Sequence, residues 1–370
     1  PIHFKYLNGE VVPRSVDPFV NVDDFEYDVR KVYMNGELLI NVQALLKEDK
    51  PWAERGFCVA HEQFVTGDYL YPTSIAPSEE RMIASHKDSL IIVKILDGSI
   101  KFNARNGSMV SYETFGQERL KAPLEPYFWK PENDNQHAAH FAERLSVWRD
   151  CAANRVVTDN TIHNDKDSNV EVRFTMTLPV GAEYTLSYLV NEYGVVRVKA
   201  DYKPVAKDIP LMPKFGMRMG IASELHSKYA IVEWYGRGPA ENYPDRKLSQ
   251  HLGYYTLNVM DYQTDYLRPQ DNGNRCDVRW MEIHTSKENQ SLMLEGFQPL
   301  CIRVNDYPLS ELESGHKHPY EIAHTIDALY LNIDLNIHGV GGVDTWGQRT
   351  LPQYTIDGNK PYSYSFVMKF

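Results

Sequence analysis

Residues 169–178 read NVEVRFTMTL, with an apolar side chain at every second position. In an extended chain these side chains fall on one face and the polar ones on the other, which is typical of a half-buried β-strand. The last nine residues, 362–370, repeat the alternation. We therefore expect a strand at each place, and we expect the final residues to lie inside the fold rather than in a frayed tail.

Turn signals outside this segment divide the chain into hairpins. Asp97-Gly98 and Asn106-Gly107 are dipeptides that accept positive φ, as tight turns between strands require, and residues 191–194 separate two further apolar runs. Helical periodicity is scarce. The one helix that we expect spans 137–149, where three apolar residues share a face: Phe141, Leu145 and Trp148. Together these patterns predict an all-β fold.

A stretch with prolines and charged residues interrupts the alternation at 68–81 and predicts a linker. Two domains are expected because 370 residues exceed one ordinary core. The first, residues 1–70, has the strand-like runs of an immunoglobulin-like sandwich but is small for one, so we expect it to be truncated. Residues 71–83 would join it to a much larger β-domain at 84–370.

Composition narrows the choice of partners. A formal net charge of −11 argues against a nucleic-acid or anionic-membrane surface, because those partners need clustered Lys and Arg. A neutral or polar small substrate fits better. No stretch approaches the roughly 20 apolar residues of a membrane span, so we expect a soluble protein, cytoplasmic or periplasmic. The four cysteines lie far apart, which predicts buried thiols rather than disulfides or a zinc site.

Four segments carry unusual runs of Gly, Pro, aromatic and polar residues, at 51–64, 236–246, 266–275 and 339–347. The second reads GRGPAENYPDR, the third YLRPQDNGNR and the fourth GVGGVDTWG. In this order and at these distances they resemble the C-terminal third of the β-galactosidases of glycoside hydrolase family 2. Four collinear matches are much more specific than one.

The resemblance implies a truncated immunoglobulin-like domain, the family's fourth, followed by a galactose-mutarotase-like β-supersandwich, its fifth. It places the acid/base and nucleophile glutamates, and the ligands of magnesium and sodium, in a (β/α)₈ barrel upstream of Pro1. The chain begins without methionine and looks cut from something longer. We therefore assign it no catalytic residue and no metal ligand, and expect the isolated chain to be inactive. Implied partners are a β-galactoside substrate, the barrel domain or large subunit, and further copies in a homo-oligomer.

Trp346 is the strongest candidate for substrate contact. In the family, the Trp of this Gly-Gly-x-Asp-x-Trp motif stands on a loop and walls the pocket, where an indole can stack on the C–H face of galactose. Asp344 shares that loop. Asn133, Asp134 and Asn135 resemble a segment leading into a family loop over the sugar, and they could bond to hydroxyls. The structural alternatives are a core tryptophan and polar side chains that tie turns together.

Two other interpretations stay open. An aldose 1-epimerase would share the large domain's fold and needs a His acid and a Glu base, for which residues qualify by type alone: His251, His316, His318 and Glu282. Alternatively, the chain is a separate small subunit or a carbohydrate-binding module without its own activity. The run 237–246 and the turn 271–275 are interpreted as structural corners held by Arg–carboxylate pairs.

Overall fold

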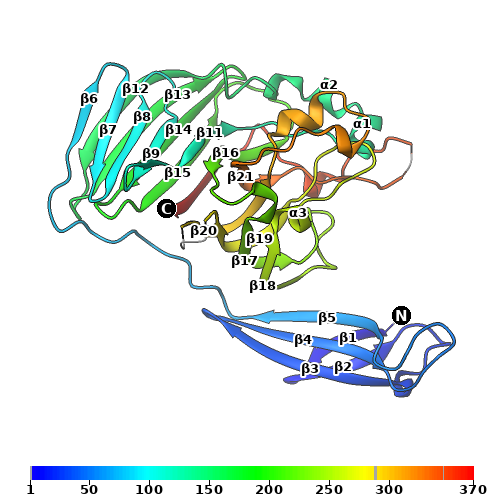
Figure 1. Cartoon of the computed structure of the whole chain (residues 1–370). Coiled ribbons are helices and arrows are strands. Elements are labelled where there is room, and N and C mark those ends of the chain that lie inside the picture. Colours follow the sequence, from blue (N-terminus) through cyan, green and yellow to red (C-terminus); the bar gives the residue numbers. More distant parts are fainter. Residues whose placement is uncertain (1, 287–289, 345) are drawn as a thin grey trace. The chain divides into compact units, whose positions relative to one another are not determined.

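The computed structural model describes residues 2–286, 290–344 and 346–370. It divides into two compact units, Pro1–Tyr71 (unit 1) and Pro72–Phe370 (unit 2), which are described separately (Figure 1). Nearly all regular structure in both units is β-strand, so the predicted all-β class is confirmed.

Unit 1 contains two antiparallel sheets. One pairs two strands and the other three: β1 (Ile2–Leu7) and β2 (Glu10–Ser15), then β3 (Phe25–Met34), β4 (Glu37–Leu46) and β5 (Cys58–Thr66). The central strand β4 is the most buried, with Leu39, Val42 and Ala44 at its core. Five strands are fewer than the seven of a complete immunoglobulin-like sandwich.

Local sequence explains how unit 1 closes. Asn35 and Gly36 connect β3 to β4 with φ angles of 39° and 98°, the left-handed pair that a two-residue hairpin turn needs. The rings of Phe4 and Tyr27 meet edge to face, with centroids 5.9 Å apart. This contact joins the two sheets into a sandwich.

Unit 2 is one continuous system of hydrogen-bonded strands from β6 to β22. The bounds are β6 (Ala84–Lys87), β7 (Leu90–Ile95), β8 (Gly98–Asn103), β9 (Met109–Thr114), β10 (Gln117–Glu118), β11 (Leu120–Tyr127), β12 (Val156–Asn164), β13 (Val170–Leu178), β14 (Ala182–Val190), β15 (Val196–Pro204), β16 (Lys214–Ala222), β17 (Ile231–Gly238), β18 (His251–Asn258), β19 (Arg275–His284), β20 (Ser291–Asn305), β21 (Ala328–Ile337) and β22 (Tyr362–Lys369).

The two strands expected from alternation are confirmed. Strand β13 covers Val170–Leu178, and its burial alternates as the apolar pattern predicts. Strand β22 pairs with β15 along Val196–Tyr202 and with β20 along Met293–Gly296. The last strand thus lies between two others, inside the sheet.

The sheet formed by β11, β16, β21 and β20 has an apolar face and a polar face. On the polar face, Glu125 lies opposite Arg218, Arg218 opposite Asn332, and Asn332 opposite Arg303. We call these four residues the polar ladder. Their sequence neighbours, such as Met217 and Leu331, point the other way into the core. Alternation therefore places a row of charged and amide groups across four strands.

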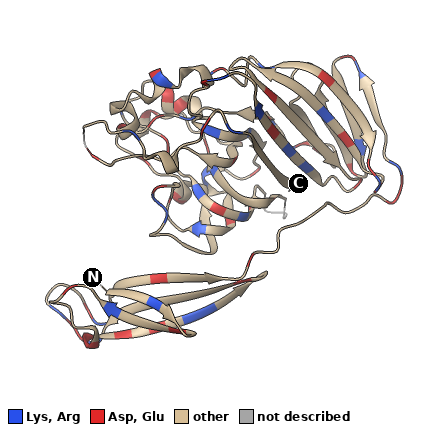
Figure 2. Cartoon of the chain, turned by 180° about the vertical axis from the view of Figure 1, so that it is seen from behind, with Lys and Arg blue, Asp and Glu red and all other residues tan. Residues whose placement is uncertain are grey.

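Ion pairs within and between strands line the exposed side of the meander from β12 to β15. Lys203 lies 3.0 Å from Glu183 on the neighbouring strand, and Lys199 lies 3.1 Å from Asp201 on its own strand. Figure 2 shows basic and acidic residues interspersed along these strands. Opposite charges placed side by side stabilise the sheet modestly and leave this surface mixed in sign.

The prediction of a single helix at 137–149 is wrong. Three short helices occupy that region instead: α1 (Asp134–Ala138), α2 (Phe141–Arg144) and the 3₁₀ turn η2 (Ser146–Trp148). His140 adopts a left-handed φ of 53° between the first two, which breaks the hydrogen-bond ladder. The predicted apolar face is nevertheless confirmed, since Phe141, Leu145 and Trp148 are all buried.

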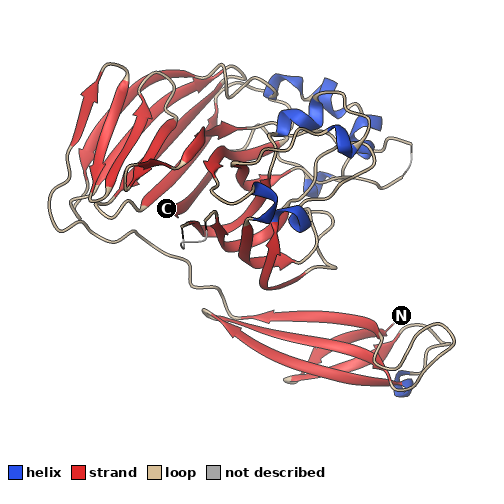
Figure 3. Ribbon diagram, viewed as in Figure 1, coloured by secondary structure: helices blue, strands red, loops and turns tan. Residues whose placement is uncertain are grey.

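The remaining helices are also short, and most of those in unit 2 gather on one side of it (Figure 3). They are η1 (Val22–Asp24) in unit 1, and η3 (Ser227–Tyr229), α3 (Val259–Tyr262), η4 (Leu309–Glu313), η5 (Pro319–Glu321) and η6 (Pro352–Tyr354) in unit 2. Among the described residues, no helix has the length and apolar character needed to cross a membrane.

Candidate functional site

The segment after Trp129 begins α1 with a capping box. The Asn133 side chain accepts from the backbone N–H of Gln136 at 2.9 Å, and the Gln136 side chain accepts from the N–H of Asn133 at 3.2 Å. Two backbone donors at the helix start are thereby satisfied. Both side chains are buried, so this end of α1 is a fixed point.

Residues 339–347, which we call the glycine loop, are tied to that fixed point. Gln136 Nε2 donates to the carbonyl of Gly339 at 2.9 Å, and Asn133 Nδ2 donates to that of Val340 at 3.2 Å. From another part of the chain, Asp245 accepts from the N–H groups of Val340 and Gly341 at 2.9 and 2.8 Å. Residues 339–341 are thus held from both sides, and we call them the loop foot.

Glycines let the loop lie close against α1. Gly342 has a φ of 90°, and a Cβ there would lie 2.9 Å from Asn135 Nδ2. Gly347 has a φ of 88°, and its Cβ would lie 2.7 Å from the carbonyl oxygen of Ala138. Side chains at these positions would strain the backbone and collide with the helix.

Buried charges lie beneath the loop foot. Lys130 Nζ donates to Gln136 at 2.7 Å and lies 3.1 Å from Asp271, whose other oxygen pairs with Arg303 of the polar ladder. Burial would raise the pKa of Asp271, but the charges of Lys130 and Arg303 outweigh it and hold that pKa below its usual value. A continuous polar path therefore runs from Arg303 to the loop foot.

Asp134 connects α1 to the third motif. Its carboxylate accepts from Arg268 Nε at 2.7 Å and from Gln270 Nε2 at 2.9 Å, while its N–H donates to Gln270 Oε1 at 3.1 Å. Glu241, in the second motif, accepts from the N–H of Gly273 at 2.9 Å. Three of the four segments singled out in the sequence, together with the segment around Asn133, therefore meet at one junction.

The described residues of the outer glycine loop are Val343, Asp344 and Trp346, which we call its tip. Asp344 Oδ1 accepts from the N–H of Trp346 at 2.9 Å and from that of Gln348 at 3.0 Å. The Trp346 side chain is 91% exposed.

The five predicted site residues fall into two groups. Asn133 is buried, and its side-chain oxygen and nitrogen both form hydrogen bonds. Asp134 bonds to the third motif. These two residues therefore position the loop. Asn135, Asp344 and Trp346 are exposed around the tip. Sequence reasoning missed several positioning residues that the motifs or their flanks contain: Lys130, Gln136, Asp245 and Asp271.

One group of side chains could be considered for a metal. Ligand atoms of Glu233, Glu282 and His284 lie within 4.8 Å of one another. Their carboxylates already accept from Tyr254 at 2.6 Å and from Ser291 at 2.5 Å. An imidazole ligand does not fit magnesium, which prefers oxygen, so the group does not match the magnesium implied by the family resemblance.

The cysteines are all free thiols. Cys151, Cys276 and Cys301 are buried, as predicted, whereas Cys58 is half-buried on β5. The sulfurs of Cys276 and Cys301 lie 3.7 Å apart on neighbouring strands. The hydrogen bond to Cys276 and, after it, burial raise the pKa of the Cys301 thiol well above its ordinary value. This thiol is therefore protonated at neutral pH.

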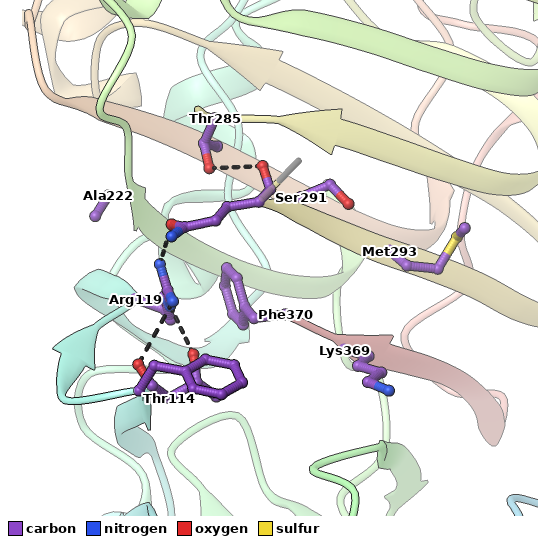
Figure 4. Close-up of a pocket in the computed structure, with 10 residues that line it drawn as sticks. Thr114, Arg119, Ala222, Thr285, Ser291, Met293, Lys369 and Phe370 are labelled. Carbon is purple, nitrogen blue, oxygen red and sulfur yellow. Dashed lines mark hydrogen bonds between the residues drawn. The ribbon is translucent and has the colours of Figure 1, made fainter. Parts of the chain in front are cut away.

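A separate depression of about 450 Å³ lies where the β9–β10 hairpin meets β20 (Figure 4). Arg119 crosses it, donating to Thr114 Oγ1 at 2.7 Å and to the side chain of Gln290. Since these polar groups bond to one another, the arrangement joins two hairpins rather than presenting a row of groups to a ligand.

Two family models match the chain. "Beta galactosidase small chain" matches residues 96–368, and "Beta-galactosidase, domain 4" matches residues 9–67. The two matched ranges fall largely in unit 2 and in unit 1, respectively.

Curated relatives carry the same description. The β-galactosidase of Priestia megaterium is 28% identical over 334 residues, covering 90% of this chain and 31% of the relative. That of Lactobacillus delbrueckii subsp. bulgaricus is 31% identical over 339 residues, covering 90% and 32%. BgaC of Bifidobacterium adolescentis is 30% identical over 381 residues, covering 99% and 34%. The chain spans about a third of the length of these relatives.

Among solved structures, galactose 1-epimerase from Lactobacillus acidophilus aligns with a TM-score of 0.48 and 10% identity, over 78% of this chain and 97% of that one. The GalM/aldose epimerase homologue from C. elegans aligns with a TM-score of 0.40 and 7% identity, over 78% and 97%. The small-chain model matches well over half of the sequence, so the chain belongs to the beta-galactosidase small chain family.

Proposed function

We propose that this chain is the C-terminal or small-subunit part of a retaining β-galactosidase of glycoside hydrolase family 2. Its relatives are about three times as long, which leaves room elsewhere for a (β/α)₈ barrel. A retaining glycosidase needs two carboxyl groups about 5 Å apart, one as acid/base and one as nucleophile. The barrel supplies that pair together with the magnesium and sodium ligands, and the isolated chain is inactive.

Trp346 is the contribution of this chain to the galactose pocket. The observation that carries the proposal is an indole that is 91% exposed at the tip of a loop whose foot is fixed by three side chains. An exposed indole offers a flat apolar face that the C–H face of galactose can cover. Asp344 shapes the tip, and Asn135 lies beside it.

The first experiment reconstitutes the complete enzyme. The chain is mixed with the barrel-bearing part of a relative, and hydrolysis of a nitrophenyl β-galactoside is followed. Activity that appears only on mixing supports a separate subunit that completes the pocket. Hydrolysis by this chain alone would contradict the proposal, because it would place the catalytic pair here.

The second experiment tests the ring itself. In the reconstituted enzyme, Trp346→Ala should raise KM about 5- to 150-fold, since one stacked ring contributes on the order of 1 to 3 kcal/mol. Trp346→Phe should recover part of that loss. Tyr320→Ala, which removes another ring that is 80% exposed, is the matched control and should leave KM unchanged. An unchanged KM in Trp346→Ala would exclude the ring from the pocket.

The epimerase alternative has less support. Glu282 accepts from Ser291 on the neighbouring strand, and His316 contacts Glu311 at 3.1 Å within its own segment. An epimerase needs its acid and base across one concave face. Glu282 and His316, two of the four candidates, instead have separate local partners.

A further inference from the structure

A cavity of about 550 Å³ opens over the polar face of β11, β16 and β21. Two segments, residues 149–153 and 308–313, close it from the sides. This volume lies within the range of small-molecule sites. We call it the sheet cavity. It shares no lining residue with the glycine loop among the described residues.

One wall combines an aromatic ring with an Arg–Glu pair. Arg149 Nη1 lies 2.9 Å from Glu313, and its guanidinium stacks 4.5 Å from the centroid of Trp129. Trp129 Nε1 donates to the same carboxylate at 2.8 Å. The Glu313 side chain is held by two donors and is still 22% exposed, so it can accept further hydrogen bonds from the cavity.

The other wall repeats this chemistry. Arg218 Nη2 and Nε donate to Glu125 at 2.8 and 3.0 Å, and the guanidinium of Arg218 stacks 4.4 Å from the centroid of Tyr127. Glu125 and Arg218 belong to the polar ladder, so their positions are fixed by strand register. Two rigid donor–acceptor pairs therefore border one cavity.

Asn332 lies on the cavity wall with an unused donor. Only 4% of the residue is exposed, and Arg303 donates to its Oδ1 at 3.0 Å. Because arginine only donates, the amide orientation is fixed and Nδ2 must be the other branch. The described residues offer no acceptor to Nδ2. Nδ2 has almost no exposed surface, so it does not face a ligand in the cavity, and Asn332 contributes to this wall by holding Arg303 in place.

We propose that the sheet cavity binds a neutral polyhydroxylated ligand, a mono- or disaccharide, at a site separate from the glycine loop. Its lining holds two arginines and three carboxylates, those of Glu125, Asp150 and Glu313, so it has no surplus of positive charge to attract an anion. A hydroxyl group can accept from the arginine and donate to the glutamate of one pair at the same time. Since no described lining residue is a histidine, the site binds the sugar without a His acid to open its ring.

Calorimetric titration of the chain with lactose and with galactose tests the site. The expected result is saturable binding that weakens about tenfold in the double variant Arg149→Met, Glu313→Gln, because charge-assisted hydrogen bonds are lost. Ala153→Trp, at an exposed lining position, should block the cavity without disturbing the core. It serves as the second variant if the double variant does not fold.

Matched titrations separate this site from the loop. Trp346→Ala should leave the affinity unchanged, and galacturonate should bind no better than galactose. Three outcomes would overturn the proposal: no binding of either sugar up to about 50 mM, which corresponds to negligible affinity; binding lost in Trp346→Ala but kept in Ala153→Trp; or a preference for the anionic sugar. None of these outcomes decides whether Trp346 contributes to the galactose pocket of the galactosidase. The KM measurement tests that role.

Discussion

The foot and the tip of the glycine loop differ sharply, although they are only a few residues apart. At the foot, the N–H of Val340 donates to Asp245 and its carbonyl accepts from Asn133, above a buried Lys130–Asp271 pair. At the tip, the Asp344 side chain accepts from the N–H groups of Trp346 and Gln348, and the ring of Trp346 is exposed. The foot therefore has the contacts that stabilise the fold, and the tip has the exposed surface.

This difference separates residues that position the site from residues that are free to bind. Substitutions at the foot should lower the free energy of unfolding, whereas substitutions at the tip should not. Unit 2 contains five of the six tryptophans, all except Trp52, so tryptophan fluorescence during urea denaturation measures its unfolding.

The largest effect is expected from Asp271→Asn. Removing the carboxylate charge leaves Lys130 and Arg303 buried without it, which should cost about 3 to 5 kcal/mol of unfolding free energy. Adding Lys130→Met should restore part of the loss, because one of the uncompensated charges is removed. A loss below about 1 kcal/mol would mean that the charges beneath the foot are not needed.

The next effect depends on pH. His338, directly before the foot, is buried, and burial lowers its pKa from 6.5 to about 4. The unfolded chain therefore binds a proton between pH 6.5 and 4 that the folded chain does not. Stability from this group is complete above pH 6.5 and is lost as the pH falls to 4, by up to about 3 kcal/mol.

His338→Gln should remove that loss, measured as the difference between variant and parent at each pH. Burial raises the pKa of Asp334 to about 6, which acts with the opposite sign in an overlapping window. Asp334 is present in both proteins, so its contribution cancels in the difference. If the free energy of unfolding changed with pH to the same extent in both proteins, the pH dependence would not come from His338.

A smaller effect is expected from Asp245→Ala. Two backbone N–H groups of the foot lose their acceptor, which should cost about 2 kcal/mol. Hydrogen exchange at Val340 and Gly341 should increase in the same variant. Asp245→Asn keeps one acceptor oxygen and should recover part of the stability. Unchanged exchange at both amides would show that the foot does not depend on this carboxylate.

The smallest effect is expected from Trp346→Ala. An exposed ring adds little to the folded state, so the free energy of unfolding should change by less than about 0.5 kcal/mol. Trp148→Ala is the matched control, since that ring is fully buried and its removal should cost about 3 to 5 kcal/mol. A large loss in Trp346→Ala would mean that the tip is part of the folded core.

Much of the fold was predictable because period-two alternation states which side chains share a face. Alternation identified β13 and β22, and helical spacing identified the apolar face around Phe141. It could not locate the break at His140, because a left-handed backbone there leaves no mark on the apolar spacing. The exposure of Trp346 agrees with the glycines around it, while its role in a sugar pocket stays a prediction.

Buried polar partners were beyond sequence reasoning. Asp271 pairs with Lys130, far away in the chain, and Asn332 is placed between Arg218 and Arg303 by the order of the strands. Alternation predicts on which face of the sheet a residue lies, but it does not predict which strand lies next to it. The run around Asp245 was interpreted as a structural corner, and its carboxylate in fact supports the glycine loop.

The position of β22 has a consequence for how the chain acquires its structure. Its segment Tyr362–Lys369 bonds to β15 on one edge and to β20 on the other. Until β22 has been synthesised, both neighbours retain unpaired backbone groups that can template association with other chains. Closure also joins segments that are distant in sequence, which makes folding slow. Nascent molecules are therefore exposed to edge-to-edge association until β22 pairs with both strands.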